Sequence, residues 1–189
     1  MFETGGSIML YGVLTVRMND AAAVSLGPDF PLGEAPPAKA PRLHQLLAEG
    51  VVRRDEVIVL ARHRDQAGGA PGGFGDLTGW ECGTNSFHLD DVIPVERRFR
   101  ADGEPVIGEA DQALLLRHGL WFAVRVAHLV AALEATVPVC CIVSTNSTGG
   151  TFRLHCARPG QSWLAADLDG YATEKIIAVD FSPAEHDPS

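Results

Sequence analysis

The chain has 189 residues, 46% of them hydrophobic and 21% charged, and it carries a formal net charge of −9. This length suits one domain with its own core, and the composition excludes a disordered chain. Nucleic-acid backbones and anionic lipid surfaces repel so acidic a protein. We therefore expect no nucleic acid and no membrane as its main partner.

The N-terminal part predicts one strand, one loop and one short helix. Apolar side chains alternate over residues 8–18, which is the pattern of a strand with one buried face. Residues 25–41 are rich in Pro and Gly and predict a surface loop. Pro41 then opens a short helix that ends before Gly50, the usual order of these two residues around a helix.

The middle of the chain combines short strands with a glycine-rich connection. Residues 56–61 are mostly apolar and predict a buried strand. Residues 68–75 are dominated by glycine and predict a flexible connection, because their spacing matches neither a phosphate-binding nor a dinucleotide-binding loop. One or two strands are expected within residues 86–100, with an interruption at Pro94.

Residues 109–136 give the clearest pattern, that of a long buried helix. Glu109 and Asp111 stand at its start, where acidic side chains favour the helix dipole. Apolar side chains cover most of its circumference, as expected for a helix inside a core, and Gly119 is expected to kink or split it. Charged and histidine side chains interrupt the apolar stretch, which argues against a membrane-spanning segment.

The C-terminal part predicts a β-β-α-β run. Its two hairpin strands, short helix and final strand fall at residues 137–145, 151–157, 163–168 and 174–181. Because helices and strands segregate along the chain, we predict an α+β fold with a mostly antiparallel sheet and helix 109–136 packed on one face. Residues 1–181 form one domain in this prediction, and residues 182–189 form a disordered tail.

The four cysteines, Cys82, Cys140, Cys141 and Cys156, show no regular spacing. Neighbours in a strand point to opposite faces, so Cys140 and Cys141 cannot easily form a disulfide with each other. This usage fits a reducing compartment. The N-terminus has no base ahead of its apolar run, unlike a secretory signal, so we expect a cytoplasmic protein.

Cys82 and His88 are the candidates for catalysis. They lie in the segment Trp-Glu-Cys-Gly-Thr-Asn-Ser-Phe-His, shortly after the glycine-rich connection. A thiolate beside a histidine base is the nucleophile of many hydrolases and transferases. This segment matches no family-specific cysteine motif, and a free cysteine is more often a small buried side chain. A cysteine-dependent hydrolase or transferase is therefore our alternative hypothesis.

Metal sites find little support in the sequence. Cys82, His88, His155 and Cys156 are zinc-ligand types, but the Cys-x-x-Cys and His-x-x-x-His spacings of common zinc sites are missing. Residues 167–170 begin like a calcium loop but lack its later ligands and its closing glutamate. We predict no metal and no cofactor.

A polar stripe runs along helix 109–136, at Asp111, His118, Trp121, Arg125 and His128. Their spacing places these side chains on one face of the helix. Trp121 beside Arg125 is the composition of a protein-binding anchor. The alternative interpretation is that the stripe marks the solvent side of a buried helix, with Trp121 partly covered.

The acidic residues are concentrated near the C-terminus. Residues 159–189 contain one base, Lys175, against Asp167, Asp169, Glu174, Asp180, Glu185 and Asp187. We expect Asp167 and Asp169 to attract a basic protein, and Trp163 or Trp121 to anchor it. Our leading hypothesis is a non-enzymatic protein-binding domain of bacterial type, such as an immunity-like inhibitor of a basic enzyme or toxin. A structural or assembly subunit, whose apolar helix forms an oligomer interface, is a further alternative.

Overall fold

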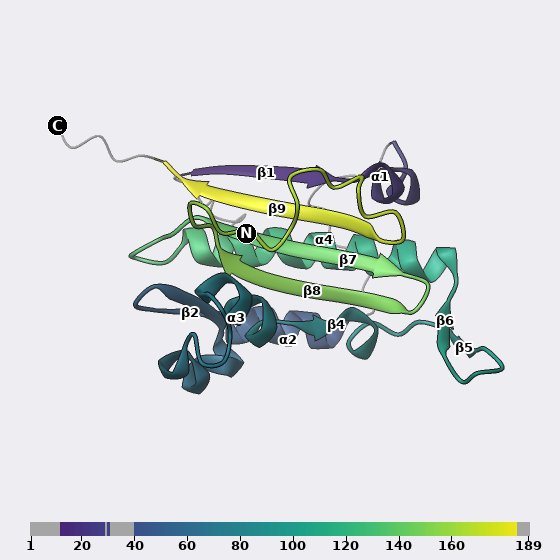
Figure 1. Ribbon diagram of the computed structural model, residues 1–189, viewed down its shortest axis with the longest axis horizontal. Coiled ribbons are helices and arrows are strands. Elements are labelled where there is room, and N and C mark those ends of the chain that lie inside the picture. Colours follow the sequence, from purple (N-terminus) through teal and green to yellow (C-terminus); the bar gives the residue numbers. More distant parts are fainter. Residues whose placement is uncertain (1–11, 29, 31–39, 185–189) are drawn as a thin grey trace, which may run out of the picture.

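The computed structural model describes residues 12–28, 30 and 40–184. Its centre is a five-stranded antiparallel sheet with the strand order β1-β9-β7-β8-β4 (Figure 1). Two small sheets, β2-β3 and β5-β6, lie beside it. A mostly antiparallel sheet with one long helix confirms the predicted α+β class.

The helices and strands have the following bounds. The strands are β1 (Gly12–Met18), β2 (Val51–Arg54), β3 (Val57–Leu60), β4 (Phe87–His88), β5 (Arg97–Phe99), β6 (Pro105–Ile107), β7 (Val139–Asn146), β8 (Gly149–Cys156) and β9 (Lys175–Pro183). The helices are α1 (Asp20–Leu26), α2 (Pro41–Glu49), α3 (Leu77–Thr84) and α4 (Glu109–Ala131), with 3-10 helices η1 (Ala61–Gly69) and η2 (Leu89–Asp91).

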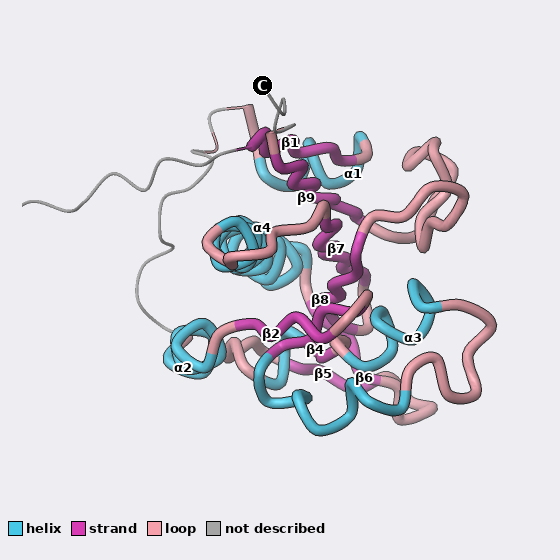
Figure 2. Tube along the Cα trace, turned by 90° about the vertical axis from the view of Figure 1, so that its left-hand side faces the viewer, coloured by secondary structure: helices cyan, strands magenta, loops and turns pink. Residues whose placement is uncertain are grey.

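Helix α4 packs on one face of the sheet, as the sequence predicts (Figure 2). Glu109 and Asp111 lie in its first turn, and the helix ends at Ala131, before the predicted residue 136. Phe122 of α4 packs edge-on against Phe152 of β8, with ring centroids 4.8 Å apart. The main hydrophobic core lies between this helix and the sheet, with α1 and α2 packed at its margins.

Gly119 does not break α4, which is continuous through it. A Cβ atom at this position would lie 2.5 Å from a methyl group of Val143 and 3.1 Å from one of Leu89. The expected split of the helix at this position is therefore wrong. The glycine instead lets the helix backbone approach strand β7 closely.

The strands of the sheet alternate between its two faces, as the period of a strand requires. In β7, Cys141 joins the core beneath α4, whereas Cys140 and Ile142 lie in a smaller cluster on the second face. In β1, Leu14 and Val16 pack against the main core. The predicted residues 8–11 of this strand lie outside the described residues.

Several predicted elements are confirmed, and others need correction. The helix at Pro41, the strands β3, β7, β8 and β9, and the two short strands β4 and β5 lie where expected, within a few residues. The expected helix at residues 163–168 is wrong, because this segment forms bends and turns. Residues 182–183 belong to β9 and not to a tail, and residues 185–189 lie outside the described residues.

Helix α4 is long and apolar enough to cross a membrane when judged by length and composition alone. Most of its apolar window, 67%, is buried inside the protein against the sheet. A core helix passes the same test, so this property is weak evidence for a membrane span. The apolar side chains of the hypothetical oligomer interface are part of the core of the chain itself.

Candidate functional site

Residues 157–174 connect β8 to β9 and lie over the second face of the sheet, opposite α4 (Figures 1 and 2). We call them the C-terminal loop. Its only regular pairing is an isolated bridge between Arg158 and Gln161. Loops longer than about 12–15 residues without helix or strand are uncommon in compact domains and are often functional. The contacts that hold this irregular loop in place therefore need to be identified.

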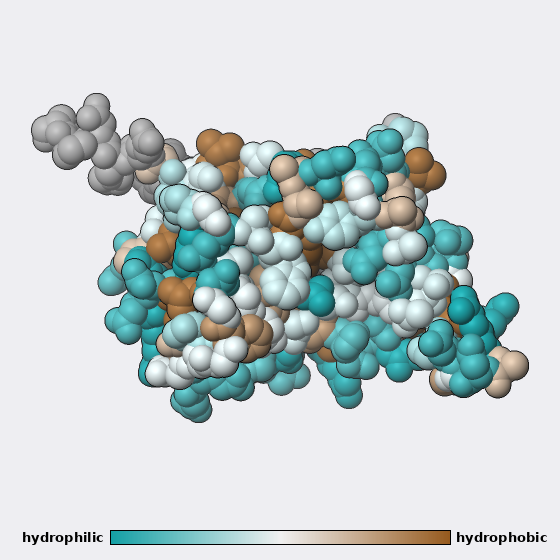
Figure 3. All heavy atoms as spheres, viewed as in Figure 1, coloured by the Kyte–Doolittle hydropathy of each residue, from teal (hydrophilic) through white to brown (hydrophobic). Residues whose placement is uncertain are grey.

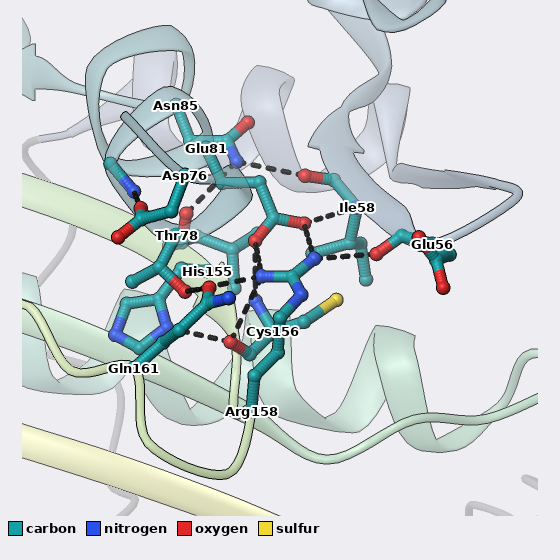
Figure 4. A network of polar contacts seen from close by, with 12 residues as sticks. Glu56, Ile58, Asp76, Thr78, Glu81, Asn85, His155, Cys156, Arg158 and Gln161 are labelled. Atoms are coloured by element: carbon teal, nitrogen blue, oxygen red, sulfur yellow. Dashed lines mark hydrogen bonds and ion pairs between the residues drawn. The ribbon is translucent and has the colours of Figure 1, made fainter. Parts of the chain in front are cut away.

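A buried ion pair holds the beginning of this loop (Figure 4). Arg158 donates from both terminal nitrogens to the carboxylate of Glu81 in α3, at 2.6 and 3.1 Å. Glu81 is fully buried, and the Arg158 side chain is 15% exposed. The guanidinium also donates to the carbonyl of Glu56 at 2.5 Å. This bidentate pairing neutralises the buried charge of Glu81 and also fixes the position of the Arg158 side chain.

The same carboxylate joins two strands to helix α3 (Figure 4). Glu81 accepts the backbone N–H of Ile58 in β3 at 2.7 Å and that of Cys156 in β8 at 2.9 Å. Asn85, also buried, donates to the carbonyls of Ile58 and Leu154 at 2.9 and 3.0 Å. Because both oxygens of Glu81 accept two hydrogen bonds each, this carboxylate holds structure and is not free to act as a base.

Helix α1 and the residue before it hold the far end of the loop. Asp169 accepts the backbone N–H of Asp20 at 2.7 Å. Asn19 caps α1, donates to the carbonyl of Glu174 at 2.7 Å and accepts the N–H of Ile176 at 3.0 Å. The loop is therefore tied at both ends by side chains that are distant in sequence.

Between its two ends, the loop borders a hollow of about 320 Å³ on the sheet, which we call the sheet hollow. The buried side chains of Ile142 and Ile176, from the sheet, line its floor. Arg153, Trp163 and Tyr171 border it. Figure 3 shows this face of the molecule, where hydrophobic residues lie deep between more hydrophilic ones. The combination of an apolar floor with a polar and aromatic rim is typical of a binding surface.

Trp163 is the exposed aromatic side chain of this rim. It is 43% exposed, and the guanidinium of Arg153 lies 5.5 Å from its ring centroid. Asp167 and Asp169 lie further along the same loop and are exposed. Neither carboxylate forms an ion pair with a cation of the residues that the structure describes. The loop thus combines an exposed aromatic side chain with two exposed carboxylates that accept backbone N–H groups but have no cationic partner among the described residues.

The structure does not place Cys82 and His88 as a catalytic pair. Cys82 is fully buried, and burial raises the pKa of its thiol to about 12. His88 is exposed and lines a separate cleft of about 420 Å³ with Arg62 and Phe87, which Cys82 does not reach. A thiol in this state does not supply the thiolate that a nucleophile needs.

The remaining cysteines are also buried, and burial acts on their thiols in the same direction. Burial raises the pKa of Cys156 to about 12 and raises the pKa values of Cys140 and Cys141 well above their ordinary range. All four cysteines are free thiols. Within the described ranges, no three or more His, Cys, Asp or Glu side chains are grouped to hold a metal ion.

The polar stripe of α4 is only partly exposed. Trp121 is 6% exposed and His118 is 3% exposed, whereas Arg125 faces solvent. Helix α2 covers this side of α4, and the ring of His44 lies 4.8 Å from that of Trp121. Trp121 is therefore not the exposed side chain that the anchor interpretation of this stripe requires, and it is covered more fully than the alternative interpretation expects.

The family comparison covers most of the site described above, but not Asn19, Asp20 and helix α1. The model of the Uncharacterized protein PM0498 family matches residues 35–187, which include α3, the C-terminal loop and the sheet hollow. The chain belongs to the PM0498 family. No curated protein and no solved structure matches it.

In this PM0498-family chain, sequence reasoning found the exposed residues of the loop but missed the pair that holds it. Trp163, Asp167 and Asp169 lie together in one loop, as their proximity in sequence requires. Glu81 and Arg158 are far apart in sequence, so no spacing rule connects them. The one available signal was a glutamate between Trp80 and Cys82, two side chains that prefer burial, because a buried carboxylate needs a cationic partner.

Proposed function

We propose that the chain is a non-enzymatic protein-binding domain that holds a basic partner, in the manner of an inhibitor or immunity protein. The observation that carries this proposal is the C-terminal loop, which exposes Trp163 and, further along the chain, the carboxylates of Asp167 and Asp169, which form no ion pair with a described residue. Tryptophan is enriched among residues that dominate binding energy, and negative charge attracts and orients a basic surface.

The preorganisation of Trp163 supports this role. Arg153 lies against its ring, and the ion pair between Arg158 and Glu81 holds the beginning of the loop. A side chain that is already held loses less conformational entropy when a partner covers it. The net charge of −9 adds long-range attraction for a basic protein. The burial of the thiols, in contrast, gives the alternative of a cysteine-dependent enzyme no support.

Partner capture with matched variants tests the proposal. The tagged chain is expressed in its native host, and co-purifying proteins are identified and then titrated against purified chain. We expect one stoichiometric basic protein. Trp163→Ala should weaken its binding by about 30-fold, which corresponds to the roughly 2 kcal/mol of a strong anchor. Replacing Asp167 and Asp169 by Asn should slow association, mainly at low salt.

Two control variants change similar residues elsewhere. Phe99→Ala removes another exposed aromatic side chain, 70% exposed on β5, and Asp65→Asn removes an exposed charge in η1. Both should leave the affinity within a factor of two. A partner that binds the Trp163→Ala variant as tightly as the unmodified chain would overturn the assignment of this loop. A clean preparation without any partner would remove the proposal itself.

A further inference from the structure

A second concave surface lies between α2 and α4. Both helices lie on the side of the sheet opposite the C-terminal loop (Figure 2). We call this surface the α2–α4 groove. Its volume is about 460 Å³, within the range of roughly 300–1,000 Å³ that ligand pockets occupy. It is separate from the sheet hollow, which opens on the opposite side of the sheet, so a ligand in this groove is independent of the proposed protein partner.

The walls of this groove are mainly apolar. Leu47 and Ala48 of α2 face Leu129 of α4, and Trp121 contributes its largely buried ring. The ring of His44 lies against Trp121 at a centroid distance of 4.8 Å, tilted by 50°. Because Trp121 is buried, its ring is held by packing, and this part of the groove is preformed.

The charge of the groove is opposite to that of the protein as a whole. Its lining includes Arg125, His44 and His128 but no aspartate or glutamate, in a chain whose net charge is −9. Arg125 is exposed and makes no ion pair or side-chain hydrogen bond with any residue that the structure describes. Burial and the neighbouring guanidinium lower the pKa of His128, so Arg125 supplies the standing positive charge at neutral pH.

We propose that the α2–α4 groove binds a small amphipathic carboxylate, such as a medium-chain fatty acid, whose head group pairs with Arg125 and whose alkyl chain lies along the apolar wall. Guanidinium and carboxylate groups match in charge and in planar geometry. One permanently charged guanidinium fits a single negative charge, whereas a phosphate group would call for several donors. The remaining lining offers apolar contact to the chain of the ligand.

Calorimetric titration of the full chain tests this site with defined probes. Octanoate, decanoate and 1-decanol are titrated below their aggregation limits. We expect saturable one-to-one binding of both carboxylates, with decanoate bound more tightly by up to about fourfold for each added methylene. Decanol, which has the same chain but no charge, should bind at least tenfold more weakly than decanoate.

Three variants assign the binding to this groove. Arg125→Gln should weaken decanoate binding about tenfold and leave decanol unchanged, whereas Ala48→Phe, which fills the groove from an exposed position, should weaken both. Arg98→Gln removes another exposed guanidinium, on β5, and should change neither. Decanoate binding that is unaffected by Arg125→Gln, or equal binding of decanol, would overturn the proposal. So would the lack of saturable carboxylate binding at millimolar concentration.

Discussion

Replacing Glu81 by Gln should cost this protein a large part of its stability. The substitution keeps the shape of the side chain but removes its charge and turns one acceptor oxygen into a donor NH₂ group. In the native structure the two oxygens accept from Ile58 and Cys156 at 2.7 and 2.9 Å, and from Arg158 at 2.6 and 3.1 Å. The new NH₂ group must therefore face at least one N–H donor, whichever way it is oriented.

The size of the effect depends on burial. Breaking a buried ion pair by removing one partner typically costs about 3–5 kcal/mol, because the other charge remains without compensation. Arg158 keeps 15% of its side chain exposed, so water solvates part of its charge and we expect about 3 kcal/mol. Urea unfolding followed by circular dichroism measures this difference, provided that the slope of the transition is unchanged.

An exposed ion pair provides the matched control. Glu96 pairs with Arg98 at 3.3 Å, with side chains 71% and 78% exposed. Glu96→Gln should therefore change the free energy of unfolding by less than about 1 kcal/mol. A loss below about 1 kcal/mol in Glu81→Gln, equal to that of the control, would refute the argument that this pair is the main tie between α3, the strands and the loop.

Three further predictions concern buried positions. Gly119→Ala should lower the melting temperature in thermal unfolding. Overpacking of the new methyl group against Val143 costs about 1–3 kcal/mol, which exceeds the roughly 1 kcal/mol gain in helix propensity. A higher melting temperature would contradict the close approach of the α4 backbone to β7. Cys82 and Cys156, whose thiol pKa values burial raises to about 12, should react with a thiol reagent at pH 8 only after unfolding, and rapid labelling of the native chain would contradict this. Burial also lowers the pKa of His155, so the unfolded chain binds a proton at this residue more strongly than the folded chain does. The free energy of unfolding should therefore decrease as pH falls from about 7 to 5. In urea titrations, His155→Asn should remove up to about 1.4 kcal/mol per pH unit of this dependence, and an unchanged dependence would contradict the prediction.

The sequence predicts those parts of the fold whose determinants are local. Helix α4 and the β7–β8 hairpin are indicated by hydrophobic periodicity, acidic residues at the helix start and a polar turn. Helix α3 is not predicted, because Gly79 and Gly83 lower helix propensity, although Asp76 caps its first turn by accepting the N–H of Gly79. Helix α1 is not predicted either, although Asn19 caps it.

The expected helix at residues 163–168 is wrong for a different reason. Its backbone groups find partners outside a helix. The N–H of Ala165 is accepted by the hydroxyl of Tyr171, the hydroxyl of Ser162 donates to the carbonyl of Leu164, and Asp167 accepts the N–H of Asp169. Such side-chain bonds compete with helical hydrogen bonds, and the tyrosine contribution comes from another part of the loop. A local pattern cannot show that competition.

The buried pair also explains why an irregular loop can present a fixed surface. Apolar residues of equal volume are often as stabilising as a buried ion pair, so stability alone does not require Glu81 and Arg158. What an apolar pair would not supply is direction, because hydrophobic contacts do not select one orientation of the chain. The fork of Arg158 meets the carboxylate in one geometry and thereby fixes where the loop leaves β8. Trp163 lies in the same loop and packs against Arg153 of β8, so we expect the pair and the proposed anchor to act as one structural unit.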